Sequence, residues 1–486
     1  MRKFYIILLL TAVFGMLTGI SYAQVTTSGL SGKIFGKDKE SLPGATVVAV
    51  HLPSGTQYGT STNADGYYRI PNMRIGGPYK ITISYVGYKP SIKEDVVLSL
   101  GQTFTLNETL LEVTSTLKGV EIVANRNALI DGNRTGASTN INNQQIQALP
   151  SINRSINDFT RLNAQTSASG SFAGSDGRYN NITIDGANFN NNFGLSTKNL
   201  PGGDAQPISL DAIEEISVNI APFDIRQSNF TGANINAVTR SGDNQFKGSA
   251  YGFYRDKSFN GDKVSNEKLS LSKTTTKTMG ARFGGPIIKD KLFFFANFES
   301  EESTFPGIPW SASTDGVGDS KKFISRTSES DLETMKQFLI TNYGYDPGSY
   351  KGFGDFKSKN HKILGRIDWN INKNNKLTVR YNYVKSTNDQ QVNATSAPGT
   401  RSNFGRISVM SMAFDNSNYG LENTVGSITA ELNSLFGTKS ANKFLVAYTK
   451  IRDTRTTGGD LFPFVDIYKD GNPYMAPKRY LEPPPD

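Results

Sequence analysis

The 486-residue sequence contains no cysteine and only two histidines, His51 and His361. The lack of cysteine excludes disulfide bonds, thiolate metal sites and cysteine nucleophiles. Two distant histidines cannot form a His-rich metal cluster, and acid–base catalysis would depend on one isolated imidazole. Phosphate loops, G-x-S-x-G elbows and H-E-x-x-H motifs are absent as well. We therefore expect a protein that is not an enzyme, with no catalytic residues, no metal site and no cofactor.

Long apolar runs are also scarce, and the clear one lies at the N-terminus. A basic pair at positions 2–3 precedes an apolar run at 4–17, and small residues follow. This order is that of a secretory signal peptide, so we expect residues 1–23 to be removed by cleavage between Ala23 and Gln24. A permanent membrane helix would need about 20 apolar residues. Because no second long apolar run follows, any membrane contact of the mature chain must use strands.

The charge balance is basic but dispersed. Lys and Arg total 52 against 43 Asp and Glu, which gives a formal net charge of +9. The basic residues are scattered without a dense patch, so we expect no nucleic-acid partner. A wet lumen and a surface facing lipopolysaccharide account better for this pattern, and aromatic residues at 11% suit membrane-interface girdles.

Residues 24–112 predict a small antiparallel β sandwich of about seven strands. Short apolar segments at 47–50, 67–70 and 81–85 are separated by turn signals such as Asn63–Gly66. The stretches LPGATVVAV, STNADGYYRI and ITISYVGY resemble the carboxypeptidase regulatory-like domain, a transthyretin-like sandwich. That resemblance implies a domain without a catalytic role.

Residues 113–127 form a polar tether that carries one compact apolar element. The element consists of Val120, Glu121, Ile122, Val123 and Ala124. By itself it reads equally well as an edge strand. An extended apolar segment on a tether is also what a partner needs in order to add a strand to its own sheet.

Residues 128–243 predict a small α/β domain. Its expected elements are helices at 146–149 and 151–162, a strand and turn at 180–186, a capped helical turn leading into a strand at 210–219, and a strand at 231–242.

Three motifs in this region resemble the plug domain of TonB-dependent outer-membrane receptors. They are YNNITIDGANF at 179–189, LDAIEEISV at 210–218 and FTGANINAVTRSG at 230–242. The residues that carry the resemblance are Asp185, Gly186, Ile213, Glu214, Glu215, Ile216, Val218, Gly232, Asn236, Thr239, Arg240 and Gly242. The resemblance implies that the tether holds the TonB box at Val120–Ala124. It also implies that Glu214 and Glu215 seat the plug against barrel arginines. An Asn-rich insertion at 188–198 departs from the family pattern.

Residues 244–486 predict transmembrane strands. Six segments have the length of about 9 to 11 residues that a tilted membrane strand needs. They lie at 246–256, 278–287, 291–299, 361–371, 376–385 and 443–451. Residues 362–369 alternate between polar and apolar side chains, as a barrel wall with a wet lumen requires. A long Gly-, Ser- and Asn-rich connection is expected at 300–356, and 284–299 resembles the Oar-like branch of the receptors.

Together these features predict a mainly β protein: an N-terminal β sandwich, a small α/β plug domain and the N-terminal part of an antiparallel outer-membrane β barrel. The resemblance implies an outer-membrane receptor that takes up a large or scarce, unidentified ligand. Its N-terminal domain and plug would lie on the periplasmic side. The implied partners are TonB with its inner-membrane energising complex, outer-membrane lipid and lipopolysaccharide. Because 244–486 holds too few strands for a plugged barrel, we expect a truncated chain. A secreted or surface β-rich adhesin is the alternative.

Overall fold

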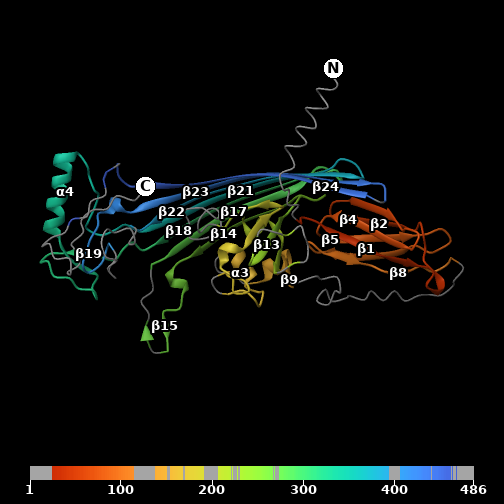
Figure 1. Cartoon of the computed structure of the whole chain (residues 1–486), viewed down its shortest axis with the longest axis horizontal. Coiled ribbons are helices and arrows are strands. Elements are labelled where there is room, and N and C mark those ends of the chain that lie inside the picture. Colours follow the sequence, from red (N-terminus) through yellow and green to blue (C-terminus); the bar gives the residue numbers. More distant parts are fainter. Residues whose placement is uncertain are drawn as a thin grey trace, which may run out of the picture.

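A computed structural model gives a mainly β architecture of three parts (Figure 1). It describes residues 25–113, 137–149, 151, 154–167, 170–190, 206–220, 222, 227, 230–265, 267–268, 273–392, 406–438, 440–460, 462–463 and 467. The N-terminal domain comprises residues 25–113, and the central domain comprises the described residues between 137 and 243. The third part is a large sheet that starts at Lys247.

The N-terminal domain contains two small sheets. Their strands are β1 (Ser28–Phe35), β2 (Thr46–His51), β3 (Thr56–Ser61), β4 (Tyr67–Met73), β5 (Gly76–Ser84), β6 (Ser91–Leu98), β7 (Thr103–Thr105) and β8 (Glu108–Thr109). One sheet has the order β4-β1-β7 with β8 also paired to β1, and the other has the order β3-β2-β5-β6. Alternate residues along β2 and β5, such as Val47 and Ile81, are buried in an apolar core of the domain. The three predicted strands are present in β2, β4 and β5.

The central domain is built on a five-stranded mixed sheet of order β11-β10-β13-β12-β9. The strands are β9 (Ala137–Asn142), β10 (Asn181–Ile184), β11 (Ala187–Asn188), β12 (Ile213–Ile220) and β13 (Ala233–Thr239), with two short helices, α2 (Asn143–Ala148) and α3 (Ile156–Thr160). The helix predicted at 151–162 is much shorter, because Ser155 caps it. The Ser155 hydroxyl accepts from the Asn157 amide, and Asp158 accepts from the Ser155 amide. The helical turn Leu210–Ala212 leading into β12 agrees with the prediction.

Seven long strands form an antiparallel sheet of order β14-β17-β18-β21-β22-β23-β24. They are β14 (Lys247–Arg255), β17 (Thr275–Ile288), β18 (Leu292–Phe305), β21 (Phe356–Asn370), β22 (Asn375–Gln390), β23 (Tyr419–Phe436) and β24 (Ser440–Thr457). Except for β14, these strands are longer than the predicted 9 to 11 residues, because backbone pairing continues past the stretch needed to cross an apolar layer. Among the described residues, β14 and β24 are the two edges of this sheet.

Strand β23 was missed by the sequence prediction. Its inward-facing positions are mostly polar, including Asn423, Ser427 and Glu431, which are all buried. A strand whose buried face is polar has no apolar run to mark it, so the hydrophobic pattern does not reveal it.

The two faces of the large sheet have inverted polarity. The face toward the central domain buries charged and polar side chains, such as Lys362, Arg380 and Asn382. The opposite face exposes apolar and aromatic side chains, which include Phe283, Ile363, Ile367, Trp369, Tyr381, Ile428, Phe444, Val446 and Tyr448. This is the alternation predicted for a wall between lipid and a wet lumen.

The connections at the two ends of the large sheet differ in length. Short turns at 289–291 and 371–374, and the short connection between β23 and β24, lie at the end beside the N-terminal domain. Long connections lie at the other end, where helix α4 (Glu329–Tyr343) and strands β19 (Ser311–Ser313) and β20 (Ile324–Ser328) occur (Figure 1). The long connection predicted at 300–356 is present between β18 and β21, and the structure adds these elements, which the sequence analysis did not predict. The α4 helix is capped by the Ser328 side chain and ends at Gly344, whose φ is 65°.

A further hairpin, β15 (Lys263–Val264) with β16 (Glu267–Lys268), projects from the long-connection end of the sheet. No helix in the described part of the chain is long and apolar enough to cross a membrane.

Candidate functional site

The central domain lies against the polar face of the large sheet (Figure 1). Apolar residues from one face of its five-stranded sheet share a core with inward-facing wall residues, among them Leu364, Val384 and Val425. This shared core brings the polar groups of the two parts into contact. The contact is the candidate functional site.

Asp185 is the residue of the central domain that meets the wall arginines. It follows β10 with a φ of 44°, in the left-handed region that Asp tolerates better than most residues, and Gly186 continues the turn with a φ of 79°. Its Oδ1 accepts from the backbone amide of Thr239 at 2.8 Å, and its Oδ2 accepts from the Thr239 hydroxyl. The first and third sequence motifs are thus joined at their ends.

Two arginines of the wall complete this network. Arg380 Nη1 on β22 lies 3.2 Å from Asp185 Oδ2 and donates to the Ile184 carbonyl at 2.7 Å. Arg366 Nη1 on β21 donates to the Thr239 carbonyl at 2.7 Å, while Asp368 balances its charge at 2.8 Å. We call Asp185, Thr239, Arg366, Asp368 and Arg380 the arginine latch. Each of the five side chains is at most one-seventh exposed. The charged groups among them are therefore stabilised by one another rather than by water.

The sequence analysis identified Asp185 and Thr239 as motif residues, but its expectation that Glu215 faces the barrel arginines is wrong. Glu215 faces the N-terminal domain instead, where its Oε1 accepts from the Leu100 amide at 3.0 Å and from Asn140 Nδ2 at 2.9 Å. Glu214 lines a cavity on that side. A register shift between Ile213 and Glu215 interrupts the alternation of the strand, so both side chains lie on the side of the N-terminal domain. Burial raises the pKa of Glu215 to about 7, and the hydrogen bonds from Leu100 and Asn140 oppose that rise.

A second buried network lies farther along the same contact. Glu299 on β18 accepts from Lys362 Nζ at 2.7 Å, from Ser209 at 2.9 Å and from the Tyr251 hydroxyl at 2.7 Å. Arg154 of the central domain pairs with Asp211 and lies 3.6 Å from Glu299. Sequence reasoning missed this network. The sequence feature that could have revealed this network is Glu299, a charged residue at an inward-facing position of a strand whose side chains alternate between the two faces.

The remaining motif residues have structural roles: they pack in the shared core, form hydrogen bonds between segments or allow close approach of the backbone. Ile213 and Ile216 lie in the shared core. Asn236 accepts from the Thr183 hydroxyl at 3.0 Å and donates to the Val25 carbonyl of the N-terminal domain. A Cβ on Gly242 would lie 2.4 Å from the Phe294 carbonyl oxygen of the wall, so only glycine fits there. A Cβ on Gly232 would likewise lie 2.3 Å from Asn180 Oδ1.

Arg240 donates its Nε to the Ile213 carbonyl at 3.2 Å. Burial and the nearby Arg282 lower the pKa of Arg240 to about 10. The predicted TonB box, from Val120 to Ala124, and the predicted cleavage site at Ala23 and Gln24 lie outside the described residues.

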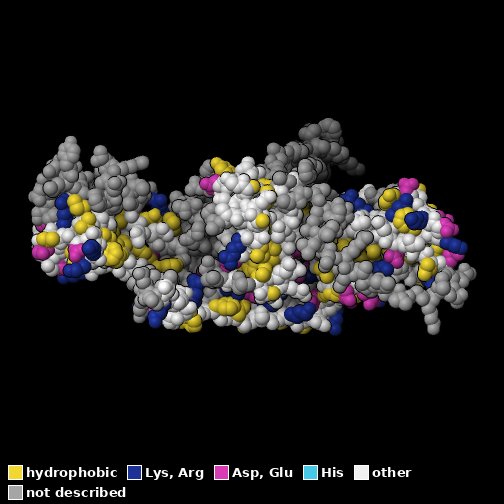
Figure 2. Space-filling view, turned by 90° about the horizontal axis from the view of Figure 1, so that it is seen from below, with side chains coloured by type: hydrophobic (Ala, Val, Ile, Leu, Met, Phe, Trp, Pro, Cys, Tyr) yellow, Lys and Arg dark blue, Asp and Glu magenta, His cyan; other side chains and the backbone are white. Residues whose placement is uncertain are grey.

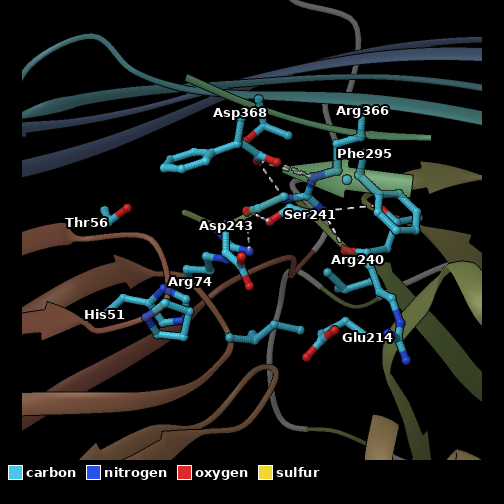
Figure 3. Close-up of a pocket in the computed structure, with 18 of the residues that line it drawn as sticks. His51, Thr56, Arg74, Glu214, Arg240, Ser241, Asp243, Phe295, Arg366 and Asp368 are labelled. Carbon is cyan, nitrogen blue, oxygen red and sulfur yellow. Dashed lines mark hydrogen bonds and ion pairs between the residues drawn. The ribbon is translucent and has the colours of Figure 1, made fainter. Parts of the chain in front are cut away.

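A cavity of about 370 Å³ lies where the three parts meet (Figure 3). His51, Thr56 and Arg74 reach it from the N-terminal domain, and Arg366 and Asp368 from the wall. Burial, with Arg74 and Lys247 nearby, lowers the pKa of His51 to about 2, so this imidazole is neutral. Within the described ranges, no group of three or more acidic or histidine side chains is placed to hold a metal ion.

Comparison with known proteins identifies two segments and one relative. Residues 29–111 match the carboxypeptidase regulatory-like domain, and residues 238–471 match the outer membrane beta barrel domain. The TonB-dependent transporter Oar of Myxococcus xanthus is 28% identical over 305 residues, which are 58% of this chain and 27% of that protein. The chain is a homologue of this TonB-dependent transporter. The barrel-domain match and this homology indicate that the protein lies in the outer membrane.

Two solved structures are also similar in fold. The outer membrane transporter YddB from Escherichia coli is 15% identical, with a TM-score of 0.43, over 65% of this chain and 39% of that one. The siderophore receptor PirA from Acinetobacter baumannii is 16% identical, with a TM-score of 0.39, over 70% of this chain and 42% of that one. The present chain thus spans less than half the length of each of these proteins. The proteins named in these comparisons are transporters and receptors rather than enzymes.

Proposed function

We propose that the N-terminal and central domains are the periplasmic domain and plug of a TonB-dependent outer-membrane receptor, and that the large sheet is part of its barrel wall. The arginine latch is the observation that carries this proposal. It fixes a separate small domain onto the polar face of a wall whose other face is apolar. The homology to a TonB-dependent transporter supports the same function. The receptor would take up a ligand too large or too scarce for diffusion.

The inverted polarity of the wall argues against a secreted or surface adhesin. A soluble β sandwich packs its apolar face inside and exposes its polar face. Here the exposed outer face carries Ile363, Ile367, Trp369 and Tyr381 on adjacent strands. An apolar surface of this kind is stable in lipid and prone to aggregate in water.

The short turns support an orientation with the N-terminal domain and plug on the periplasmic side. Bacterial outer-membrane barrels have short periplasmic turns and long outer loops. The short turns here lie at the end occupied by the N-terminal domain, whereas α4 lies at the end with the long connections (Figure 1). The ligand would therefore arrive at the α4 end and leave beside the N-terminal domain.

TonB would act through the predicted box at 120–124. This segment lies in the connection between the N-terminal domain and β9. Within the described part of the chain, β9 is an edge strand of the plug sheet and pairs with β12 alone. TonB would bind the box by strand addition, in which backbone hydrogen bonds supply the affinity. A pull on the box is then transmitted to one edge strand, so the plug can rearrange without breaking its central ladders.

Cysteine cross-linking tests this function directly, because the chain has no native cysteine. Single cysteines at 120, 121, 122, 123 and 124 are combined in cells with a single cysteine in the receptor-binding segment of TonB. We expect disulfides at the box positions that alternate in yield, since successive side chains of a strand point to opposite faces. Val113→Cys, outside the box, is the matched control.

Proline supplies the second arm of this test. Ile122→Pro removes a backbone donor, so it should abolish cross-linking of a cysteine at 120 while leaving the receptor in the outer membrane. Cross-linking that is unchanged by this proline, or that is equal at 113 and 122, would refute the box assignment.

A further inference from the structure

We propose that the N-terminal domain is a docked cap over the periplasmic outlet beside the plug, and that it undocks when TonB pulls on the connection at 114–136. This proposal rests on the proposed function. It adds a second closure on the periplasmic side to the closure made by the plug itself. The contacts that dock the cap come from four separate segments of the N-terminal domain, at Val25, at 53–58, at Ile75 and at Leu100.

One set of contacts joins the cap to the plug. The backbone of Leu100 donates its amide to Glu215 at 3.0 Å and accepts from Asn140 Nδ2 at 3.0 Å. Asn236 donates to the Val25 carbonyl. Beside these hydrogen bonds, Val25, Ile75 and Leu100 of the cap bury Val238 of β13 in a small apolar cluster. The cluster is separate from the cores of both domains.

A second set joins the cap to the short-turn end of the wall. Asn370 Nδ2 donates to the Thr56 hydroxyl at 2.9 Å, and the Asn244 amide donates to the Pro53 carbonyl at 2.9 Å. Lys376 Nζ lies 4.1 Å from the centre of the Tyr58 ring. The cap is therefore held to the wall as well as to the plug, and it spans the edge between them.

The composition of this interface suits a reversible contact. It combines dispersed single hydrogen bonds with an apolar cluster of four residues, and it borders the partly open cavity of about 370 Å³. Each domain keeps its own larger apolar core, so separating them unfolds neither. Figure 2 shows many of the acidic side chains visible on the plug side gathered over the N-terminal domain, which is the composition of a water-exposed surface.

The chain path links this interface to TonB. The box at 120–124 lies in the chain between the cap, which ends at Val113, and β9 of the plug. A pull on the box would therefore apply force to the cap and to the plug at the same time. Asn140, which bonds to Leu100, lies on β9 itself. The strand that TonB would pull therefore carries one of the hydrogen bonds that hold the cap.

Cysteine accessibility measures undocking without a known ligand. Val238→Cys places a thiol in the apolar cluster, covered by the cap, whereas Ala237→Cys places one on the opposite face of β13 in the core of the plug. Maleimide labelling in outer-membrane fragments should be slow at both positions. In cells, an energised TonB should accelerate labelling at 238 at least fivefold over a TonB-deficient strain and should leave 237 unchanged.

A charge substitution opens the cap independently of TonB. Leu100→Asp buries a carboxylate in the cluster beside Glu215, so it should raise labelling at 238 at least tenfold and leave 237 unchanged. Val97→Asp, at an exposed position of the same domain, is the matched control and should change neither rate.

Fast labelling at 238 in the unmodified receptor, or no effect of Leu100→Asp, would overturn the docked cap. Labelling at 238 that responds to Leu100→Asp but not to TonB would overturn the release by TonB. A receptor that cross-links to TonB through its box yet fails these labelling tests would keep the proposed function and lose the cap.

Discussion

Replacing Asp185 with asparagine should loosen the plug from the wall, because it removes the carboxylate that faces Arg380 and Arg366. Arg380 is 1% exposed and reaches Asp185 across the boundary between the two parts. Leaving a buried charge without its partner costs about 3 to 5 kcal/mol. We expect the lower end of this range, because Arg380 keeps its hydrogen bonds to the Ile184 carbonyl and the Thr429 hydroxyl, and Arg366 keeps Asp368.

A loss of about 3 kcal/mol corresponds to an increase of about a hundredfold in the equilibrium constant for separation, at roughly 1.4 kcal/mol per factor of ten. Val384→Cys reports this equilibrium, since Val384 is fully buried between β22 and the plug. The measurement is the rate of thiol labelling at 384 in folded receptor, which follows the population of the open state when closing is fast. Asp65→Asn, in an exposed turn of the N-terminal domain, is the control.

A double-mutant cycle separates the charge pair from other effects of the substitution. Arg380→Gln alone should also accelerate labelling at 384, because it leaves Asp185 with one arginine fewer. The double variant should cost less than the sum of the two single variants, since both charges leave together. Labelling at the wild-type rate in Asp185→Asn, or strict additivity in the cycle, would refute the latch as an energetic contact.

Two further predictions concern the cap and the outer face. Because burial raises the pKa of Glu215 from 4.5 to about 7, docking should be strongest below pH 4.5, weaken by about 3 kcal/mol up to pH 7 and stay level above it. Glu214 is the charged neighbour that adds to this shift. Labelling of Val238→Cys, divided by that of an exposed Val97→Cys to correct for thiol ionisation, should rise over this range, and a rise that persists in Glu215→Gln would contradict the assignment. Ile428→Lys, at a 48% exposed position midway along β23, should cost about 2 to 4 kcal/mol in lipid and lower the amount of receptor recovered in the outer membrane. The same change at Val317, in a long connection, should leave recovery unaffected, and equal losses at both positions would show that residue 428 does not face lipid.

The features that depend on local pattern could be predicted from the sequence. The alternation along residues 362–369 indicated a wall with one polar face, and burial of Lys362 and Leu364 beside exposed Ile363 confirms it. The turn at Asp185 and Gly186 and the helical turn before β12 followed from short motifs. Strand ends, β23 and the helix α4 did not follow, because pairing to a neighbouring strand and the packing of a loop are decided by residues elsewhere in the chain.

The sequence by itself determined most of the strand segments of the wall, which side chains share a face along them, and that Asp185 would lie at a motif turn. Only the tertiary structure decided which partners these side chains meet. Asp185 and Arg380 are 195 positions apart, and Glu215 and Leu100 are 115 apart. Nothing local in either motif distinguishes a carboxylate that will face an arginine from one that will face a backbone amide. That choice depends on how the central domain is placed against the wall and the N-terminal domain, and the packing of the two apolar cores and the small cluster around Val238 fixes it.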